Sequence, residues 1–100
     1  MSILIEELLE PVAHRKNRMC VTGTATTVHR IARWWRTGMT ADEIAADYSH
    51  LSLAGVHSAL AYYFANREKI DAEIESDIVE ERKIVNEHSR HKRSPVKETV

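Results

Sequence analysis

Cysteine, proline and glycine are scarce in this sequence of 100 residues, which contains one, two and three of them. Because Cys20 is the single cysteine, no internal disulfide can form, and packing of apolar side chains has to stabilise the fold. The sequence also has no apolar run near the ~20 residues that cross a bilayer, and its first residues are acidic where a signal peptide is basic. These absences predict a cytoplasmic chain with no membrane partner.

A strong overall charge is missing as well. The formal net charge is −1 and 43% of the residues are hydrophobic, values that are ordinary for one globular domain and that indicate no partner. A chain of this length buries only about two thirds of its unfolded surface. We therefore expect a homodimer, since association would help so short a chain to reach useful stability.

The most informative stretch contains two signals for the start of a helix. Thr40 is a good N-cap, and Glu43 is placed three residues later, where it can complete a capping box. Ser52 is a second N-cap, a few residues further along. Two short helices joined by a tight corner predict a helix-turn-helix, and such units place their second helix in the major groove of DNA.

The two helices predicted around this corner share an apolar face. The first covers residues 41–47, the corner covers residues 48–51, and the second helix starts at Leu53. Spacings of three and four residues predict one buried set: Ile44, Ala45, Tyr48, Leu51, Leu53, Val56, Leu60, Tyr63 and Phe64. The opposite face of the second helix is small and nearly uncharged, and it comprises Ala54, Gly55, His57, Ser58, Ala61 and Tyr62.

Two shorter elements are predicted near the N-terminus. Residues 1–10 form a short helix or an edge segment, and Pro11 ends it. Residues 14–18 are a basic connector, and residues 19–22 form a short strand. A lone strand needs a partner, which is either the first segment or the same strand of a second subunit.

A helix that carries adjacent tryptophans follows the strand. Thr26 or Thr27 caps it, and it runs to Arg36 with Gly38 as its C-terminal glycine. Its apolar stripe comprises Val28, Ile31, Ala32 and Trp35. For Trp34 and Trp35, core packing or a subunit contact is a better interpretation than base stacking, because these rings bury large areas.

The last part of the sequence is a charged helix followed by a tail. The helix covers residues 67–87, and its narrow apolar stripe comprises Ile70, Ile74, Ile78 and Val85. Residues 88–100 are basic and interrupted by proline, so we expect a mobile tail. The predicted fold is therefore mainly all-α, with an N-terminal arm and short strand (1–22), a helix-turn-helix domain (23–66), a long C-terminal helix and the tail.

Charge is segregated along the chain although the total is near zero. Residues 15–36 contain six basic residues and no acidic ones, whereas residues 68–81 contain seven acidic residues and one basic residue. The basic segment suits the phosphates of nucleic acid, and the acidic helix suits a protein partner. Alternatively, the two segments neutralise each other within a subunit or across a dimer, since charge runs on helices are usually solvated faces.

These patterns give two sets of candidate binding residues. The DNA set comprises Arg30, Arg33 and Arg36 for phosphates, Ser52 at the helix start, and His57 and Ser58 for base edges. The partner set comprises Ile70, Ile74 and Ile78 with Glu73, Asp77 and Glu81. Because the base-edge candidates include no arginine, asparagine or glutamine, we expect weak, phosphate-driven binding more than sharp base readout.

No pattern in the sequence indicates catalysis, a metal or a cofactor. The spacings of its histidines fit no ligand motif: His14, His29, His50, His57, His88 and His91. There is no glycine-rich phosphate loop either. An enzyme would need a pocket that brings Cys20 and a histidine within hydrogen-bond reach, and nothing local indicates one.

Many of these residues lie in a pattern that resembles a small bacterial family. The pattern comprises Gly23-Thr24, Val28, Ile31, Gly38-Met39-Thr40, Glu43-Ile44, Tyr48, Leu51-Ser52-Leu53, Val56, Ala59-Leu60-Ala61-Tyr62-Tyr63, Glu68 and Ile70-Asp71. Over about residues 18–78 it is similar to domain-of-unknown-function family 433, whose members are often classed as VapB-like antitoxins. The family usually reads Gly-Thr-Arg, and here Ala25 replaces the arginine.

The resemblance implies a homeodomain-like helical fold, commonly dimeric, often encoded beside a PIN-like ribonuclease toxin. Our first hypothesis is therefore an antitoxin-like regulator that binds operator DNA through its helices and a nuclease toxin through its C-terminal segment. The second hypothesis is a protein-interaction module that binds no DNA. It is supported by the exposed face of the helix that starts at Leu53, which is small and nearly uncharged.

Overall fold

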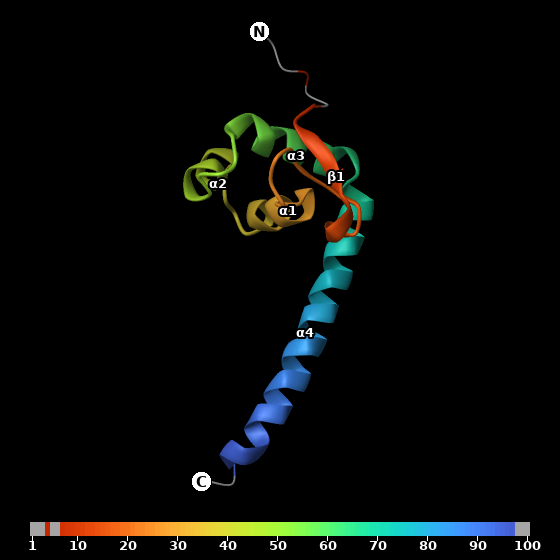
Figure 1. Ribbon diagram of the computed structural model, residues 1–100, viewed down its shortest axis with the longest axis vertical. Coiled ribbons are helices and arrows are strands. Elements are labelled where there is room, and N and C mark those ends of the chain that lie inside the picture. Colours follow the sequence, from red (N-terminus) through yellow and green to blue (C-terminus); the bar gives the residue numbers. More distant parts are fainter. Residues whose placement is uncertain (1–3, 5–6, 98–100) are drawn as a thin grey trace. The chain divides into compact units, whose positions relative to one another are not determined.

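Helices make up most of the part of the chain that the structure describes. The structure, a computed structural model, describes residue 4 and residues 7–97, with side chains as far as residue 87. Its elements, in order, are β1 (Leu9–Val12), the 3-10 turn η2 (Ala13–Arg15), β2 (Arg18–Val21), α1 (Val28–Arg36), α2 (Ala41–Asp47), α3 (Leu53–Ala65) and α4 (Arg67–Lys97) (Figure 1). The predicted fold class, mainly helical with a short N-terminal strand and a long C-terminal helix, is confirmed.

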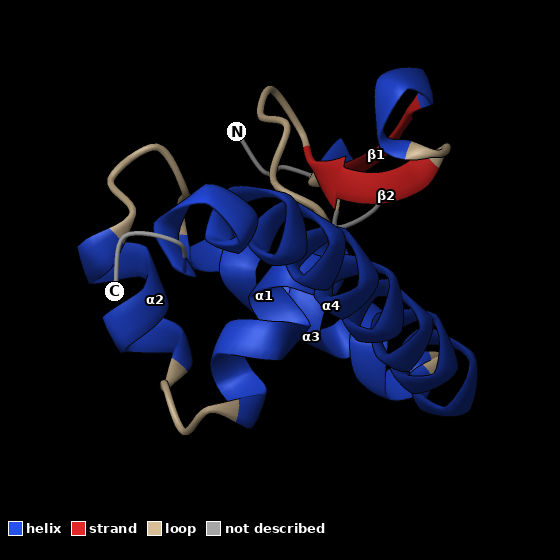
Figure 2. Cartoon of the chain, turned by 90° about the horizontal axis from the view of Figure 1, so that it is seen from below, coloured by secondary structure: helices blue, strands red, loops and turns tan. Residues whose placement is uncertain are grey.

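The strand predicted at residues 19–22 is β2, and its partner is the first segment of the same chain. β1 and β2 pair antiparallel, with Leu9 opposite Val21 and Val12 opposite Arg18 (Figure 2). The basic connector forms the hairpin turn between them, where Lys16 and Asn17 both have φ near +60°. Of the two partners considered for the strand, the structure therefore gives the intramolecular one.

Pro11 lies inside β1, so the prediction that it ends the first segment is wrong. The N–H of Thr22 donates to the carbonyl oxygen of Leu8 at 2.9 Å. Hydrogen-bonded pairs alternate along an antiparallel ladder, so they fall at even-numbered residues of β1 and leave Pro11 at a position whose N–H points away from β2. In a two-stranded sheet that edge is unpaired, and proline is tolerated there.

The cap signals around α1 are confirmed. Thr27, one of the two candidates, is the N-cap, and its hydroxyl accepts from the N–H of Arg30 at 3.0 Å. Gly38 follows the last turn with φ +106°, a left-handed conformation in which glycine has no Cβ penalty. The helix is thus stopped shortly before the N-cap of α2.

One core unites the hairpin and the first three helices. α3 contacts α1, α2 and both strands, and α1 also contacts α2 and β2. The most deeply buried apolar side chains of this unit are Cys20, Val28, Ile31, Ala32, Ile44, Val56, Ala59, Tyr63 and Ile70. The hairpin within the predicted N-terminal arm therefore belongs to the same compact unit as the helices, which ends at Ile70.

Two predictions of burial on α3 are wrong. Leu53 and Phe64 were expected in the core, but they are 44% and 45% exposed. Gly55 and Ser58 were expected on the exposed face, but both are buried. The physical reason is the hairpin: α3 is covered on a second side by β2, where a Cβ at Gly55 would lie only 2.7 Å from Cγ1 of Val21.

α4 is longer than the sequence indicated. It was expected to end near residue 87, and it continues to Lys97 through the segment expected to be a mobile tail. Residues 98–100 lie outside the described part. The residues from Asp71 onward form a second compact unit. No helix in the described residues combines the length and the apolar character needed to cross a membrane.

Candidate nucleic-acid interface

The corner between α2 and α3 is held by both predicted caps. Thr40 and Glu43 form the capping box: the Thr40 hydroxyl accepts from the Glu43 N–H at 3.1 Å, and the Glu43 carboxylate accepts from the Thr40 N–H at 2.8 Å. Ser52 accepts from the N–H of Gly55 at 3.0 Å. Between them, the N–H of Leu51 donates to the carbonyl oxygen of Tyr48 at 2.9 Å and closes the turn. The sequence signals thus set the start of each helix and the bend between them.

The exposed surface of α3 is more apolar than the sequence indicated. Leu53, Ala54, His57, Ala61 and Tyr62 are exposed along it. None of these side chains can make the bidentate hydrogen bonds by which arginine reads guanine or asparagine reads adenine. Small and apolar side chains can still contact the methyl group of thymine.

Among the base-edge candidates, His57 is exposed and Ser58 is not. Ser58 is only 8% exposed, because it lies one turn after Gly55 on the side of α3 that meets the hairpin. Ser52 is exposed, but its hydroxyl oxygen already accepts the capping hydrogen bond. His57 is therefore the polar candidate whose side chain is most accessible on α3.

The three arginines of α1 lie in successive turns of the helix. Arg30 and Arg36 are exposed and Arg33 is half-buried. Arg33 and Arg36 stand in the last turn, where positive charge also stabilises the negative end of the helix dipole. Arg30 lies with its guanidinium carbon 6.0 Å from the centre of the Trp34 ring.

The adjacent tryptophans pack on aromatic neighbours. Trp34 stacks on Tyr48 with ring centres 4.0 Å apart and an angle of 9° between the planes, which joins α1 to the end of α2. Trp35 meets Phe64 of α3 edge-on, with ring centres 4.9 Å apart. Both tryptophans are half-buried. These contacts agree with the packing interpretation, since one face of the Trp34 ring is already covered by Tyr48.

Of the residues considered for catalysis, Cys20 lies in the core and His50 is exposed. Cys20 is fully buried, and burial raises the pKa of its thiol; the charge of Arg15 lowers it and that of Glu10 raises it. His50 makes a hydrogen bond with the hydroxyl of Thr26 at 3.0 Å. Within the described residues, no group of three or more histidine, cysteine or acidic side chains is placed to hold a metal ion.

The predicted partner residues on α4 differ in how far their side chains are exposed. Ile70 and Ile74 are buried, Glu73, Asp77 and Ile78 are half-buried, and Glu81 is exposed. Ile78 and Glu81 line a groove, together with Arg82, Val85 and Asn86. The last three were not among the predicted partner residues, although the seven-residue interval from Ile78 to Val85 is the interval of a helical stripe.

Comparison with known proteins identifies the family. A family model described as "Protein of unknown function (DUF433)" matches residues 14–63, which is half of the chain. Searches of curated proteins and of solved structures gave no match. The matched segment begins in the hairpin and ends in α3, so it contains β2, α1 and the capped corner. The chain belongs to the DUF433 family.

Proposed function

We propose that this protein is an antitoxin-like regulator that binds DNA. The observation that supports this best is the corner itself: a capped α2, a tight turn and a capped α3 on which Leu53, Ala54 and His57 are exposed. In helix-turn-helix proteins the N-terminal residues of the second helix approach base edges, while neighbouring elements contact the backbone. In this proposal α3 approaches the base edges, and α1, which contacts α2 and α3, supplies positive charge for the phosphates.

Phosphate contacts dominate the proposed binding. Arg30, Arg33 and Arg36 hold the phosphates, and each contact releases counterions, so affinity falls steeply as salt rises. His57 and the apolar side chains of Leu53 and Ala54 face the bases. Because they offer few directional hydrogen bonds, discrimination among sequences is modest.

The partner in this proposal is a PIN-like ribonuclease. The acidic side chains of α4, Glu73, Asp77 and Glu81, with Ile78 beside them, suit a basic protein surface. A nuclease carries positive charge where it binds RNA, so an acidic helix is a reasonable competitor for that site.

Fluorescence anisotropy on DNA from upstream of the gene tests the DNA half of the proposal. The double variant Arg30→Ala/Arg36→Ala should bind more weakly, and the slope of log affinity against log salt should become shallower by up to about 2. Lys69→Ala removes an exposed positive charge from α4 and should leave that slope unchanged. Absence of binding at low salt would remove the DNA role.

Co-expression with the neighbouring open reading frame tests the partner half. The neighbour should be toxic alone and harmless when this protein is present, and the two should co-purify. Substitution of Glu73, Asp77 and Glu81 by glutamine should weaken the co-purification. A neighbour that is harmless alone would contradict the antitoxin role.

A protein-interaction module without DNA binding is the second candidate function. It is favoured by the exposed apolar side chains of α3: Leu53, Tyr62 and Phe64 are 44%, 36% and 45% exposed. This second function is favoured if a titration with DNA shows no binding at low salt and a nuclease co-purifies with the protein.

A further inference from the structure

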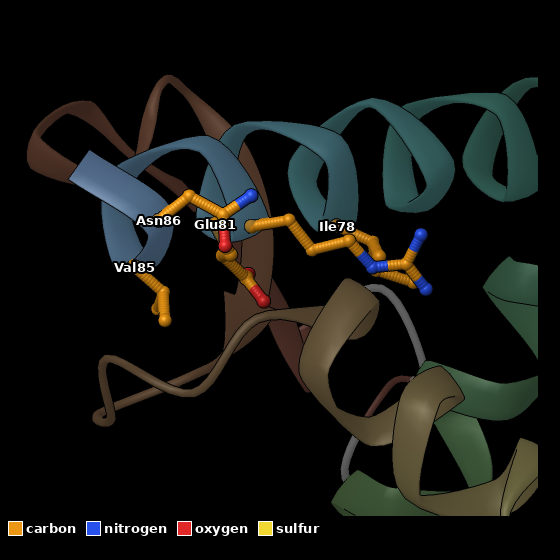
Figure 3. Close-up of a pocket in the computed structure, with 5 residues that line it drawn as sticks. Ile78, Glu81, Val85 and Asn86 are labelled. Carbon is orange, nitrogen blue, oxygen red and sulfur yellow. The ribbon is translucent and has the colours of Figure 1, made fainter. Parts of the chain in front are cut away.

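The middle of α4 carries a groove with an unusual arrangement of charge. Its volume is about 390 Å³, and it is lined by Ile78, Glu81, Arg82, Val85 and Asn86. Figure 3 shows the side chains of Ile78, Glu81, Val85 and Asn86 following one another along α4, with Ile78 and Val85 as the apolar members. Val85 is 59% exposed. An exposed apolar stripe on a charged helix is a surface that another helix can cover.

The charge of α4 changes sign in the middle of this groove. Residues 68–81 contain seven acidic residues and one basic residue, and residues 82–97 contain six basic residues and one acidic residue. The change falls between Glu81 and Arg82, which both line the groove and lie at the midpoint of α4 (Arg67–Lys97). The helix is therefore acidic in one half and basic in the other.

We propose that the groove is filled by α4 of a second copy of this chain, running antiparallel. In that arrangement Ile78 of one copy lies near Val85 of the other, and the acidic half of each helix faces the basic half of its partner. A parallel arrangement would place like charges together along the whole length, which is unfavourable. The complementarity belongs to the chain's own sequence, so a second copy satisfies it without any other molecule.

The geometry of α4 suits this pairing. At 1.5 Å per residue the helix is about 45 Å long. Ile70 and Ile74 at its start are already buried, so an antiparallel pair centred on the groove meets along the exposed part that follows Ile74. The two-fold symmetry makes the contact self-complementary, as in most homodimers. This inference does not rest on DNA or toxin binding, and either can fail without affecting it.

Sedimentation equilibrium of the full chain tests the pairing, with two exposed apolar residues as a matched pair. Val85 lines the groove, whereas Ile84, 61% exposed, does not line it. Val85→Glu should weaken dimerisation by about tenfold or more, because a charge would be buried in the contact. Ile84→Glu adds the same charge outside the groove and should leave the dimer intact. Circular dichroism confirms that both variants remain folded.

Disulfide trapping tests the orientation. Ile78→Cys and Val85→Cys proteins, mixed and oxidised, should give mainly the mixed disulfide, since an antiparallel pair brings these positions together. Cys20 is fully buried and does not compete. A chain that stays monomeric at every concentration, a dimer unaffected by Val85→Glu, or a mixture containing only 78–78 and 85–85 disulfides would overturn the proposal.

Discussion

At Gly55, α3 and β2 come so close that a methyl group has no room. An added Cβ would lie 2.7 Å from Cγ1 of Val21 and 3.0 Å from the capping oxygen of Ser52. Neither neighbour can move freely, because Val21 is a buried β-branched residue and Ser52 holds the first turn of α3. Glycine at this position is therefore a packing requirement, although glycine inside a helix is unfavourable by itself.

Gly55→Ala should lower the free energy of unfolding by about 1–3 kcal/mol, the usual effect of overpacking. The measurement is urea denaturation. Val21→Ala removes the methyl groups that the new Cβ would meet, so the effect of Gly55→Ala should be smaller in that background. An alanine variant as stable as the parent would contradict the close approach, since helix propensity alone favours alanine.

The buried thiol of Cys20 makes the free energy of unfolding depend on pH. The thiol is fully buried, and burial raises its pKa, with Arg15 opposing and Glu10 adding to the shift. In the unfolded chain the thiol ionises near its ordinary value of about 8.5. Above that pH the folded chain retains a proton that the unfolded chain loses, so the stabilising contribution declines as pH rises.

The pH effect is measured as a difference between two proteins. The stability advantage of the parent over Cys20→Ala should be constant below about pH 8 and should shrink as the pH rises beyond about 8.5. Taking the difference removes the titration of lysines and tyrosines, which both proteins share. A difference that stays constant to high pH would show that the thiol does not titrate differently in the two states.

Among the elements, α2 depends most on its cap because it is short. A helix of seven residues is too short to be stable alone, so its capping box and the burial of Ile44 have to hold it. The stack of Trp34 on Tyr48 adds a contact between α1 and the end of α2. α2 is thus held by local hydrogen bonds at its start and by aromatic packing at its end.

Thr40→Ala should destabilise the fold by about 1 kcal/mol, because the N–H of Glu43 loses its acceptor. Glu43→Gln is the matched control: an amide oxygen can still accept from the Thr40 N–H, so its effect should be smaller. Thermal or urea denaturation gives both values. A Thr40→Ala variant no less stable than Glu43→Gln would show that the box contributes little.

For the molecule as a whole, self-association makes the stability of the fold depend on the protein concentration. If α4 pairs with α4 of a second copy, unfolding is coupled to dissociation, and the melting temperature should rise with protein concentration. The Val85→Glu variant should show a weaker dependence, and Ile84→Glu should behave as the parent does. Differential scanning calorimetry over a range of concentrations gives this result. A melting temperature independent of concentration in the parent would contradict pairing in the folded state.

A symmetric dimer would also bear on DNA binding. Helix-turn-helix dimers contact two half-sites related by the same two-fold axis as the protein. If both proposals hold, the preferred operator should be palindromic, and Val85→Glu should weaken DNA binding without removing any contact to DNA.

Local signals in the sequence are enough to set where the helices begin and where the chain turns. Thr27, Thr40 and Ser52 act on N–H groups within three residues, so their capping roles follow from the order of the amino acids alone. The signal at Gly38 is equally local, because its positive φ directly follows the last turn of α1. Family membership follows from the same residues.

Which faces of the helices are covered depends on packing between distant segments. The periodicity of α3 predicts one buried face, but the hairpin packs on a second one and buries Ser58. Leu53 and Phe64, predicted in the core, are exposed. The place of Pro11 inside β1 likewise follows from the register of the hairpin and not from the proline itself. These outcomes arise from contacts between segments far apart in the sequence, and a local pattern carries no information about which distant segment will pack against it.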